Sequence, residues 1–183
     1  IISSAGDANI FNASWGIKTL GNISAYNIRT RAQIENLTDA GFIDSIVNAA
    51  IDNDAIFVWA AGNDGTKQSN ALSALPRVIN ELDGHFINVV AWDTDAGRIA
   101  DYSNHCGVTK LYCITAPGTG IDVGIGLADG TSFATPLVSG AIATIREAFP
   151  YMTAAEVTQL LFTTARDLGE AGVDEIYGWG MLD

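Results

Sequence analysis

The sequence feature that most constrains the fold is an uninterrupted apolar run at residues 55–61, Ala-Ile-Phe-Val-Trp-Ala-Ala. A run of this kind is typical of a strand buried on both faces of a parallel sheet. Residues 86–92 and 111–116 form similar runs, and residues 8–13 form a shorter one. Helical patterns alternate with these runs, so the sequence predicts an α/β domain with a largely parallel sheet flanked by helices.

Three segments have helical signals. From Thr38 to Asn53-Asp54 the apolar residues fall on one face of a helix. These positions are Phe42, Ile43, Ile46, Val47, Ala50 and Ile51. A second helix is expected from about residue 131 to Pro150, and a capping box at Thr153 and Glu156 opens a third that runs through Arg166. Residues 17–37, 93–103 and 120–126 are polar or glycine-rich, and we expect loops there.

Length and charge restrict the class of protein. A chain of 183 residues with 48% hydrophobic residues can bury a sizeable core, and we expect one domain over residues 1–183. The net charge of −12 argues against nucleic acid and anionic membrane surfaces as partners. No apolar run approaches the roughly 18 residues that span a bilayer. Residues 1–4 include no initiator Met and do not resemble a signal peptide, so we expect a mature product or an excised segment.

The main candidate for chemistry is Ser132, within residues 130–136, Gly-Thr-Ser-Phe-Ala-Thr-Pro. It precedes the apolar helical pattern of the second helix, and Pro136 fits only an early helical position. Unpaired N–H groups and the positive end of the helix dipole would stabilise negative charge beside Ser132. Taken alone, a Gly-Thr-Ser sequence is more readily explained by a serine that caps a helix.

The longer match decides between these explanations. Residues 130–140, Gly-Thr-Ser-Phe-Ala-Thr-Pro-Leu-Val-Ser-Gly, resemble the nucleophile signature of the subtilisin-like serine proteases, the subtilases of the peptidase S8 family. Every fixed position of that signature is met, through Val138 and Gly140. The resemblance implies a subtilisin-like three-layer fold, a serine endopeptidase activity, a polypeptide substrate and Ser132 as nucleophile.

A second motif of the same family follows the first apolar run. Residues 60–63, Ala-Ala-Gly-Asn, match the subtilase run whose asparagine contributes to the oxyanion hole. The resemblance therefore assigns Asn63 to that role, together with the backbone N–H of Ser132. It also assigns Ala60, Ala61 and Gly62 to one wall of the specificity pocket, where small residues leave room for a large apolar side chain. Residues 74–76 are expected near the same pocket.

The end of the first strand resembles the substrate-binding edge of subtilases. Ser14, Trp15 and Gly16 match a Ser-apolar-Gly sequence that pairs with extended substrate by backbone hydrogen bonds. Trp15 would then offer an apolar wall to substrate, although a partly buried core tryptophan explains it equally well. Ala-Pro-Gly at residues 116–118 and Gly-Trp-Gly at residues 178–180 also match the family.

The catalytic Asp and His motifs of subtilases do not occur in this sequence. A serine protease needs a histidine to accept the serine proton and an aspartate to orient that histidine. The two histidines, His85 and His105, both follow the Asn63 motif, and we expect them in surface loops. The chain therefore resembles the C-terminal portion of a catalytic domain, and we expect an upstream segment to supply the Asp and His. By itself the chain is expected to be inactive.

Two details point to a subgroup and to a location. The Tyr-Gly-Trp-Gly sequence at residues 177–180 and the cysteine pair before residues 116–118 resemble subtilase passenger domains of bacterial autotransporters. That resemblance implies an extracellular or bacterial cell-surface location, where a disulfide between Cys106 and Cys113 can persist. Two free thiols remain the alternative, and the spacing fits no zinc site.

The sequence predicts no metal ligands and no cofactor. Calcium is frequent in subtilases, and this resemblance is the single reason to consider it, because no acidic cluster here has a coordinating spacing. The competing function is a non-catalytic subtilase-like pseudoenzyme or peptide-binding module that keeps the cleft without the upstream residues. The upstream sequence would discriminate the two.

Overall fold

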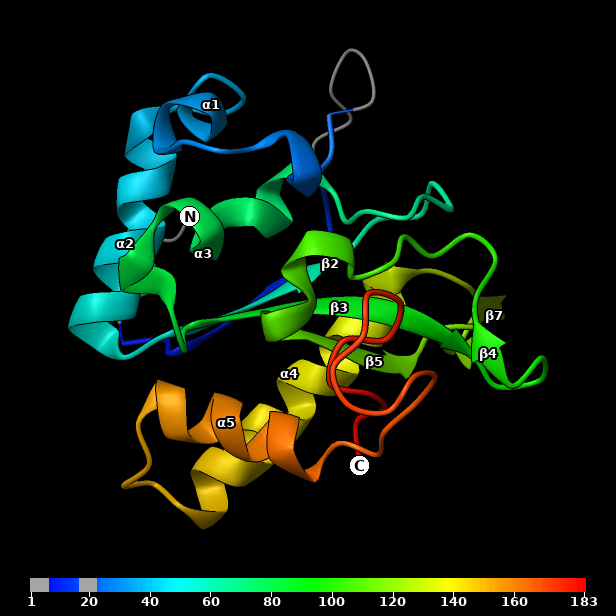
Figure 1. Ribbon diagram of the computed structural model, residues 1–183. Coiled ribbons are helices and arrows are strands. Elements are labelled where there is room, and N and C mark those ends of the chain that lie inside the picture. Colours follow the sequence, from blue (N-terminus) through cyan, green and yellow to red (C-terminus); the bar gives the residue numbers. More distant parts are fainter. Residues whose placement is uncertain (1–6, 17–22) are drawn as a thin grey trace.

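A five-stranded sheet forms the middle layer of the computed structural model, which describes residues 7–16 and 23–183 (Figure 1). The expectations for residues 1–4 and for residues 17–22 lie outside this part of the chain. The parallel strands are β1 (Ile10–Ala13), β2 (Ile56–Ala60), β3 (Phe86–Asp93) and β5 (Cys113–Pro117). The two-residue strand β4 (Arg98–Ile99) pairs antiparallel with the end of β3.

The central strands are buried on both faces, as their apolar runs predict. All five residues of β2 and the first six of β3 are buried. Their register pairs Phe57 with Phe86 and Ala60 with Val89. Because parallel strands end at the same edge of a sheet, the segments after β1, β2 and β5 meet there. This edge is the one that residues 14–16, 62–63 and 118 occupy.

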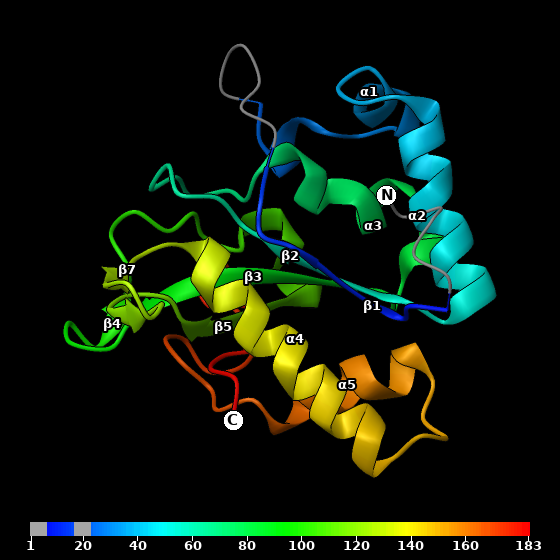
Figure 2. The ribbon, with the colours of Figure 1, turned by 180° about the vertical axis from the view of Figure 1, so that it is seen from behind.

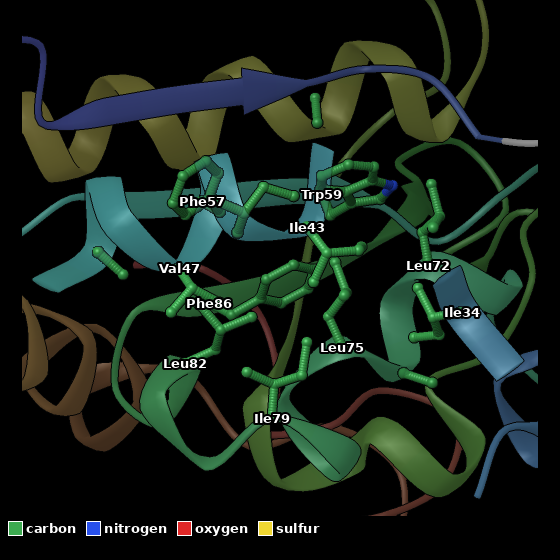
Figure 3. Packing of buried hydrophobic residues seen from close by; sticks show 14 of the residues in the cluster. Ile34, Ile43, Val47, Phe57, Trp59, Leu72, Leu75, Ile79, Leu82 and Phe86 are labelled. Atoms are coloured by element: carbon green, nitrogen blue, oxygen red, sulfur yellow. The ribbon is translucent and has the colours of Figure 1, made fainter. Parts of the chain in front are cut away.

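One face of the sheet is covered by α1 (Arg31–Glu35), α2 (Ala40–Asn53) and α3 (Leu75–Val78). Figure 3 shows Ile43 and Val47 of α2 packed with Phe57, Trp59 and other buried side chains. Ile51, expected on the same face, is instead 60% exposed, so the buried stripe of α2 is narrower than predicted.

The other face is covered by α4 (Thr131–Ala148) and α5 (Ala154–Thr164). Seen from behind in Figure 2, α4 runs across the sheet, where it contacts β1, β2, β3 and β5. Ala134, Val138 and Ile142 form its buried face, which confirms the helical spacing. The predicted capping box of Thr153 and Glu156 opens α5. The fold is therefore a three-layer α/β domain, as predicted.

Several short elements lie where the sequence predicted loops, a longer strand or no element at all. Within residues 23–37 there are a 3-10 helix (Ala25–Asn27) and α1, and further 3-10 helices span Ala71–Ala74 and Asn80–Leu82. The 120–126 segment and the residues after it form a hairpin of β6 (Ile121–Asp122) and β7 (Leu127–Ala128). Residues 111 and 112 end a 3-10 helix (Gly107–Tyr112) and do not begin β5. These elements are too short for a periodic pattern to reveal them.

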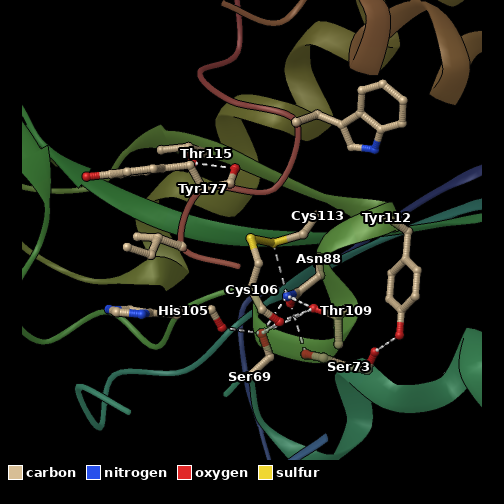
Figure 4. Close-up of a disulfide and its surroundings, with 12 residues drawn as sticks. Ser69, Ser73, Asn88, His105, Cys106, Thr109, Tyr112, Cys113, Thr115 and Tyr177 are labelled. Atoms are coloured by element: carbon tan, nitrogen blue, oxygen red, sulfur yellow. Dashed lines mark hydrogen bonds between the residues drawn. A yellow bond between two sulfur atoms is a disulfide. The ribbon is translucent and has the colours of Figure 1, made fainter. Parts of the chain in front are cut away.

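Cys106 and Cys113 form a disulfide, which resolves the two alternatives left by the sequence. Both sulfurs are fully buried. Figure 4 shows the side chain of Asn88 beside them, where its Nδ2 donates to Ser69 Oγ and Thr109 Oγ1 and lies 3.4 Å from Cys113 Sγ. The disulfide therefore joins β5 to the 3-10 helix that precedes it, in the interior of the protein.

Candidate active site

Ser132 is the second residue of α4 and points its hydroxyl at the end of β1. Ser132 Oγ donates to the carbonyl oxygen of Ser14 at 3.0 Å, and Ser14 Oγ donates to the carbonyl oxygen of Ser132 at 2.8 Å. The backbone N–H of Ser132 belongs to the first turn of a helix, where an α-helix has no internal acceptor for it. The serine therefore stands at the positive end of an 18-residue helix, as predicted.

Asn63 reaches this serine from the loop after β2. Its Oδ1 accepts hydrogen bonds from the backbone N–H and the hydroxyl of Thr131, at 2.9 and 2.8 Å. Because a backbone N–H can only donate, these contacts fix which side-chain atom is the oxygen. Nδ2 then faces the other way, and it donates no hydrogen bond to any of residues 7–16 or 23–183. Asn63 thus presents two free N–H donors beside Ser132.

These groups line one pocket of about 220 Å³. It is lined by Trp15, Gly16, Ala60, Gly62, Asn63, Asp64, Asn70, Thr131 and Ser132. Five of the residues assigned from the substrate edge and the Ala-Ala-Gly-Asn motif therefore meet at the serine. Gly130 leaves the space that Asn63 needs, since a Cβ there would lie 3.3 Å from Asn63 Nδ2. Its φ of 153° is also one that residues with a Cβ rarely adopt.

Trp15 is both a partly buried tryptophan and an apolar wall of the pocket, the two roles that the sequence left open. One part of its ring packs on Trp59 and Phe42, with centroid distances of 5.0 and 6.0 Å. The remainder is exposed, since the residue keeps 50% of its accessible surface, and it lines the pocket. Trp15 is thus an apolar wall supported from behind by aromatic rings.

Ala61 is an exception among the predicted pocket residues. Its side chain is fully buried with Val90 and the disulfide, on the side of β2 away from the pocket. The backbone of Ala61 is hydrogen-bonded on both sides. Its N–H donates to the carbonyl oxygen of Val89, and its carbonyl oxygen accepts from the backbone N–H of Asn70. Because side chains alternate along a strand end, Ala60 faces the pocket and Ala61 faces the core.

Residues 74–76 do not lie at this pocket either. Ala74 and Leu75 are fully buried in the core under α2, and Pro76 lines a separate groove next to α5. The residue of this region that reaches the pocket is Asn70, whose Nδ2 donates to the carbonyl oxygen of Ala60 at 2.6 Å. The sequence gave no signal of this role, because Asn70 is a polar residue outside every motif.

Tyr102 holds the entry to α4 and was not singled out by the sequence. Its hydroxyl donates to the carbonyl oxygen of Gly118 at 2.6 Å and accepts from the backbone N–H of Gly130 at 3.0 Å. Burial raises the pKa of this phenol above its ordinary value, so the hydroxyl keeps its proton at neutral pH. It therefore ties Gly118, directly after β5, to the residue that precedes the Thr131-Ser132 pair.

Neither histidine has a hydrogen bond to Ser132. His85 precedes β3, at the edge of the sheet opposite the serine, and its Nδ1 lies 3.0 Å from the carbonyl oxygen of Ala55. His105 lies next to the loop after β2, with its backbone N–H donating to Thr66. Burial is the main cause that lowers the pKa of the His105 imidazole, and the positive charge of nearby Lys67 lowers it further.

The arrangement brings together a serine hydroxyl, two sources of N–H donors and an adjacent strand end. Hydrogen-bond donors fixed around one point stabilise the oxyanion of a tetrahedral intermediate. The described residues contain no cluster of three or more His, Cys, Asp or Glu side chains able to hold a metal ion. None of the helices seen in residues 7–16 and 23–183 has the length and apolar character needed to cross a bilayer.

Comparison with known families identifies the family to which the chain belongs. The profile of the subtilase family, Peptidase S8, matches residues 1–180. This match covers nearly the whole chain, including the loop that carries Asn63 and the start of α4, which carries Ser132.

Two curated relatives are at least 30% identical to this chain over the aligned residues. The serotype-specific antigen 1 of Mannheimia haemolytica is 36% identical over 192 residues, covering 97% of this chain and 20% of that protein. The autotransporter lipoprotein NalP of Neisseria meningitidis serogroup B is 31% identical over 150 residues, covering 70% of this chain and 13% of that protein. The chain therefore spans a fifth or less of the length of these relatives. The predicted resemblance to autotransporter subtilases is confirmed.

Solved structures agree with the fold. The prenylagaramide maturation protease PagA superposes with a TM-score of 0.68 at 25% identity, covering all of this chain and 62% of that one. The patellamide maturation protease PatA gives a TM-score of 0.68 at 27% identity, with 99% and 61% coverage. The subtilisin-like fold predicted from the sequence is therefore confirmed.

Proposed function

Because this chain belongs to the subtilase family, we propose that it is the serine-bearing part of a serine endopeptidase in which Ser132 is the nucleophile. The observation that carries the proposal is the shared pocket of the Ser132 side chain and the unpaired Nδ2 of Asn63. A hydroxyl and a free amide donor on one pocket are what acyl transfer requires. The proposed reaction uses no metal and no cofactor.

The proposed reaction proceeds through an acyl-enzyme. Ser132 Oγ attacks the peptide carbonyl carbon while its proton passes to a base, and the carbonyl oxygen becomes an oxyanion. Asn63 Nδ2 and the backbone N–H of Ser132 donate hydrogen bonds to that oxyanion. The C–N bond then breaks, the amine takes the proton from the base, and the ester on Ser132 remains. Water, deprotonated by the same base, then attacks the ester carbonyl carbon. The bond between that carbon and Ser132 Oγ breaks, the carboxylic acid leaves, and the base returns its proton to Ser132 Oγ.

The segment after β1 is proposed to bind the substrate backbone. Ser14, Trp15 and Gly16 follow β1 directly and belong to no strand or helix, and we propose that their backbone pairs with the substrate by strand addition. Ser14 O, now an acceptor for Ser132 Oγ, becomes available to a substrate N–H when the base takes over the serine proton. Trp15, Ala60 and Gly62 would surround the side chain next to the scissile bond.

The base is proposed to come from an upstream segment that carries the Asp and His motifs. Within residues 7–16 and 23–183, β1 pairs only with β2, so its outer edge is free for a further strand. That edge ends beside Ser132, which suits a segment that must bring a histidine to the serine. We propose that the 183 residues without that segment are inactive.

An extracellular or cell-surface location accompanies this proposal. The buried disulfide is suited to an oxidising compartment. A further relative, 30% identical over 156 residues, is an extracellular serine protease of Serratia marcescens. The identities of the substrate and of the cleavage site are not part of the proposal.

The second candidate is a non-catalytic peptide-binding module. The absence of any histidine hydrogen-bonded to Ser132 in residues 7–16 and 23–183 favours it. This module would keep the pocket and the free strand edge but would not hydrolyse what it binds.

The test is casein hydrolysis by the full-length protein and its Ser132→Ala variant. Ser139→Ala, a change two turns further along α4, is the matched control. The proposal expects Ser132→Ala to lower kcat by about 10⁶-fold and the control to retain activity. Activity that survives Ser132→Ala contradicts the proposal. Casein binding without hydrolysis by the unchanged protein supports the second candidate.

A further inference from the structure

The side chain of Asn104 is buried against the loop that carries Asn63. It keeps 2% of its accessible surface. Its Oδ1 accepts from the backbone N–H groups of Asp64 and Thr66, at 3.1 and 3.0 Å, and from Thr66 Oγ1 at 3.0 Å. Its Nδ2 donates to the carbonyl oxygen of Ala61 at 3.0 Å. Both ends of this carboxamide are therefore satisfied by one turn of chain.

These contacts lie on both sides of Asn63. Ala61 precedes Asn63 by two residues, and Asp64 follows it directly. The Asp64 N–H has no other acceptor among residues 7–16 and 23–183, so Asn104 alone holds the peptide unit that follows Asn63. Gly62 makes room for the contact, because a Cβ there would lie 2.4 Å from Asn104 Nδ2.

Asn104 is itself fixed by backbone contacts. Its N–H donates to the carbonyl oxygen of Gly62 at 2.9 Å, and its carbonyl accepts from Ser103 Oγ at 2.9 Å. Two residues further on, Cys106 is bonded to Cys113 at the start of β5. The carboxamide therefore sits on a segment that is anchored to the sheet.

The direction of the Asn63 side chain depends on this support. Thr131 holds Asn63 Oδ1 from the α4 side, but it contacts only the side-chain end of the residue. The position of the Asn63 backbone is set by the turn at residues 61–66. Because an oxyanion donor must be held within a few tenths of an ångström, a shift of this turn would move Asn63 Nδ2 off its target.

We propose that Asn104 is a positioning residue that fixes the turn at residues 61–66 and thereby aims Asn63 Nδ2 at the reacting oxygen. This inference rests on the proposed function of Asn63. It assigns Asn104 no contact with substrate. Its effect on the reaction therefore passes through Asn63 and disappears when Asn63 is removed.

A double-mutant cycle in the full-length protein tests the proposal. Asn104→Ala is measured with Asn63 present and in the Asn63→Ala background. With Asn63 present we expect kcat to fall about 10-fold with KM within about twofold, since the donor is displaced but not removed. In the Asn63→Ala background the same change should alter kcat by less than about twofold. Asn104→Asp, which keeps the shape but replaces the Nδ2 donor, serves if the alanine variant does not fold.

Asn88→Ala is the matched control for loss of a buried, fully hydrogen-bonded carboxamide. Asn88 bonds to residues around the disulfide and not to the 61–66 turn, so its effect should be equal in the two backgrounds. Hydrogen exchange gives a readout independent of activity. The Asp64 amide should exchange faster in Asn104→Ala, while the Ala61 amide, bonded to Val89, stays protected.

The outcomes separate the two levels of the argument. If Asn63→Ala alone is fully active, the proposed function of Asn63 is wrong and this inference falls with it. If Asn63→Ala is impaired but Asn104→Ala costs the same factor in both backgrounds, only this inference is wrong. Unchanged exchange at Asp64 also contradicts it.

Discussion

Ser14 and Ser132, 118 residues apart, exchange two hydrogen bonds that join the end of β1 to the start of α4. In this arrangement the Ser132 hydroxyl donates its proton in a hydrogen bond to the carbonyl oxygen of Ser14, which is too weak a base to remove it. A base must take over that proton before the oxygen becomes a nucleophile. The groups around Ser132 are therefore in place, but none of residues 7–16 and 23–183 activates its hydroxyl.

The first prediction concerns Asn63. In the full-length protein, Asn63→Ala should lower kcat by about 10²–10³ with little change in KM, because the lost donor acts mainly on the oxyanion. Steady-state kinetics on a peptide substrate measures this. Asn36→Ala, at an exposed asparagine after α1, is the control. An equal loss in both variants would contradict the assignment.

The second prediction concerns Thr131, whose hydroxyl donates to Asn63 Oδ1 and lies 3.3 Å from the Gly62 N–H. Thr131→Val removes this hydroxyl with little change in shape, but the backbone N–H of residue 131 still holds Asn63. We therefore expect kcat to fall by about 3–10-fold, the equivalent of roughly 0.7–1.4 kcal/mol.

The matched control is Thr135→Val, one turn further along α4. Thr135 is buried too, but among the described residues its hydroxyl bonds only to the carbonyl oxygen of Thr131 within the helix. It should change kcat by less than about twofold. If the two valine variants lose equal activity, the Thr131 contact is not what orients Asn63.

The third prediction concerns the disulfide, which closes a loop with a sequence separation of 7. Replacing both Cys106 and Cys113 by serine should lower the free energy of unfolding by about 2–3 kcal/mol, from the entropy gained by the unfolded chain. Urea unfolding followed by tryptophan fluorescence measures the change. When the unchanged protein is denatured without reductant, neither Cys106 nor Cys113 should react with iodoacetamide. Modification of both cysteines under those conditions would refute the disulfide.

The fourth prediction is a pH dependence of stability from His105. Burial and Lys67 lower its folded pKa, so the unfolded chain binds the proton more tightly. The contribution of neutral His105 to the free energy of unfolding is therefore fully present above the unfolded pKa of about 6.5. It is lost as the pH falls through that value toward the lower folded pKa. Between pH 7.5 and 5, His105→Gln should lose less stability than the unchanged protein, by under about 1 kcal/mol for this half-buried ring. Identical losses would show that His105 does not contribute.

Long, strongly patterned elements were predictable from the sequence. The apolar run in β2 and the helical spacing in α4 are local signals, so each predicted its own element and its burial. The site followed from contiguous motifs, because Ser132 and Asn63 stand at the ends of those elements. Even Ala60 and Ala61 could be placed at the end of β2, but which of the two faces the pocket depends on the strand's phase in the sheet.

The supports of the site could not be predicted. Asn104 bonds to residues about 40 positions earlier, and Asn70 and Tyr102 are ordinary polar residues in segments that look like loops. Their roles arise from where the chain brings them, which no local pattern records. The same holds for β4 and the β6–β7 hairpin, whose two-residue strands exist only through their pairing.

The most direct test of the account is covalent labelling of Ser132 by a fluorophosphonate, located by peptide mass spectrometry. The 183-residue chain alone should resist labelling, because Asn63 and the helix end stabilise an oxyanion but do not remove the serine proton. The full-length protein, or the chain supplemented with the upstream segment, should be labelled at Ser132. Rapid labelling of Ser132 in the 183-residue chain would contradict the claim that its base lies elsewhere, and failure to label Ser132 in the full-length protein would contradict its role as nucleophile.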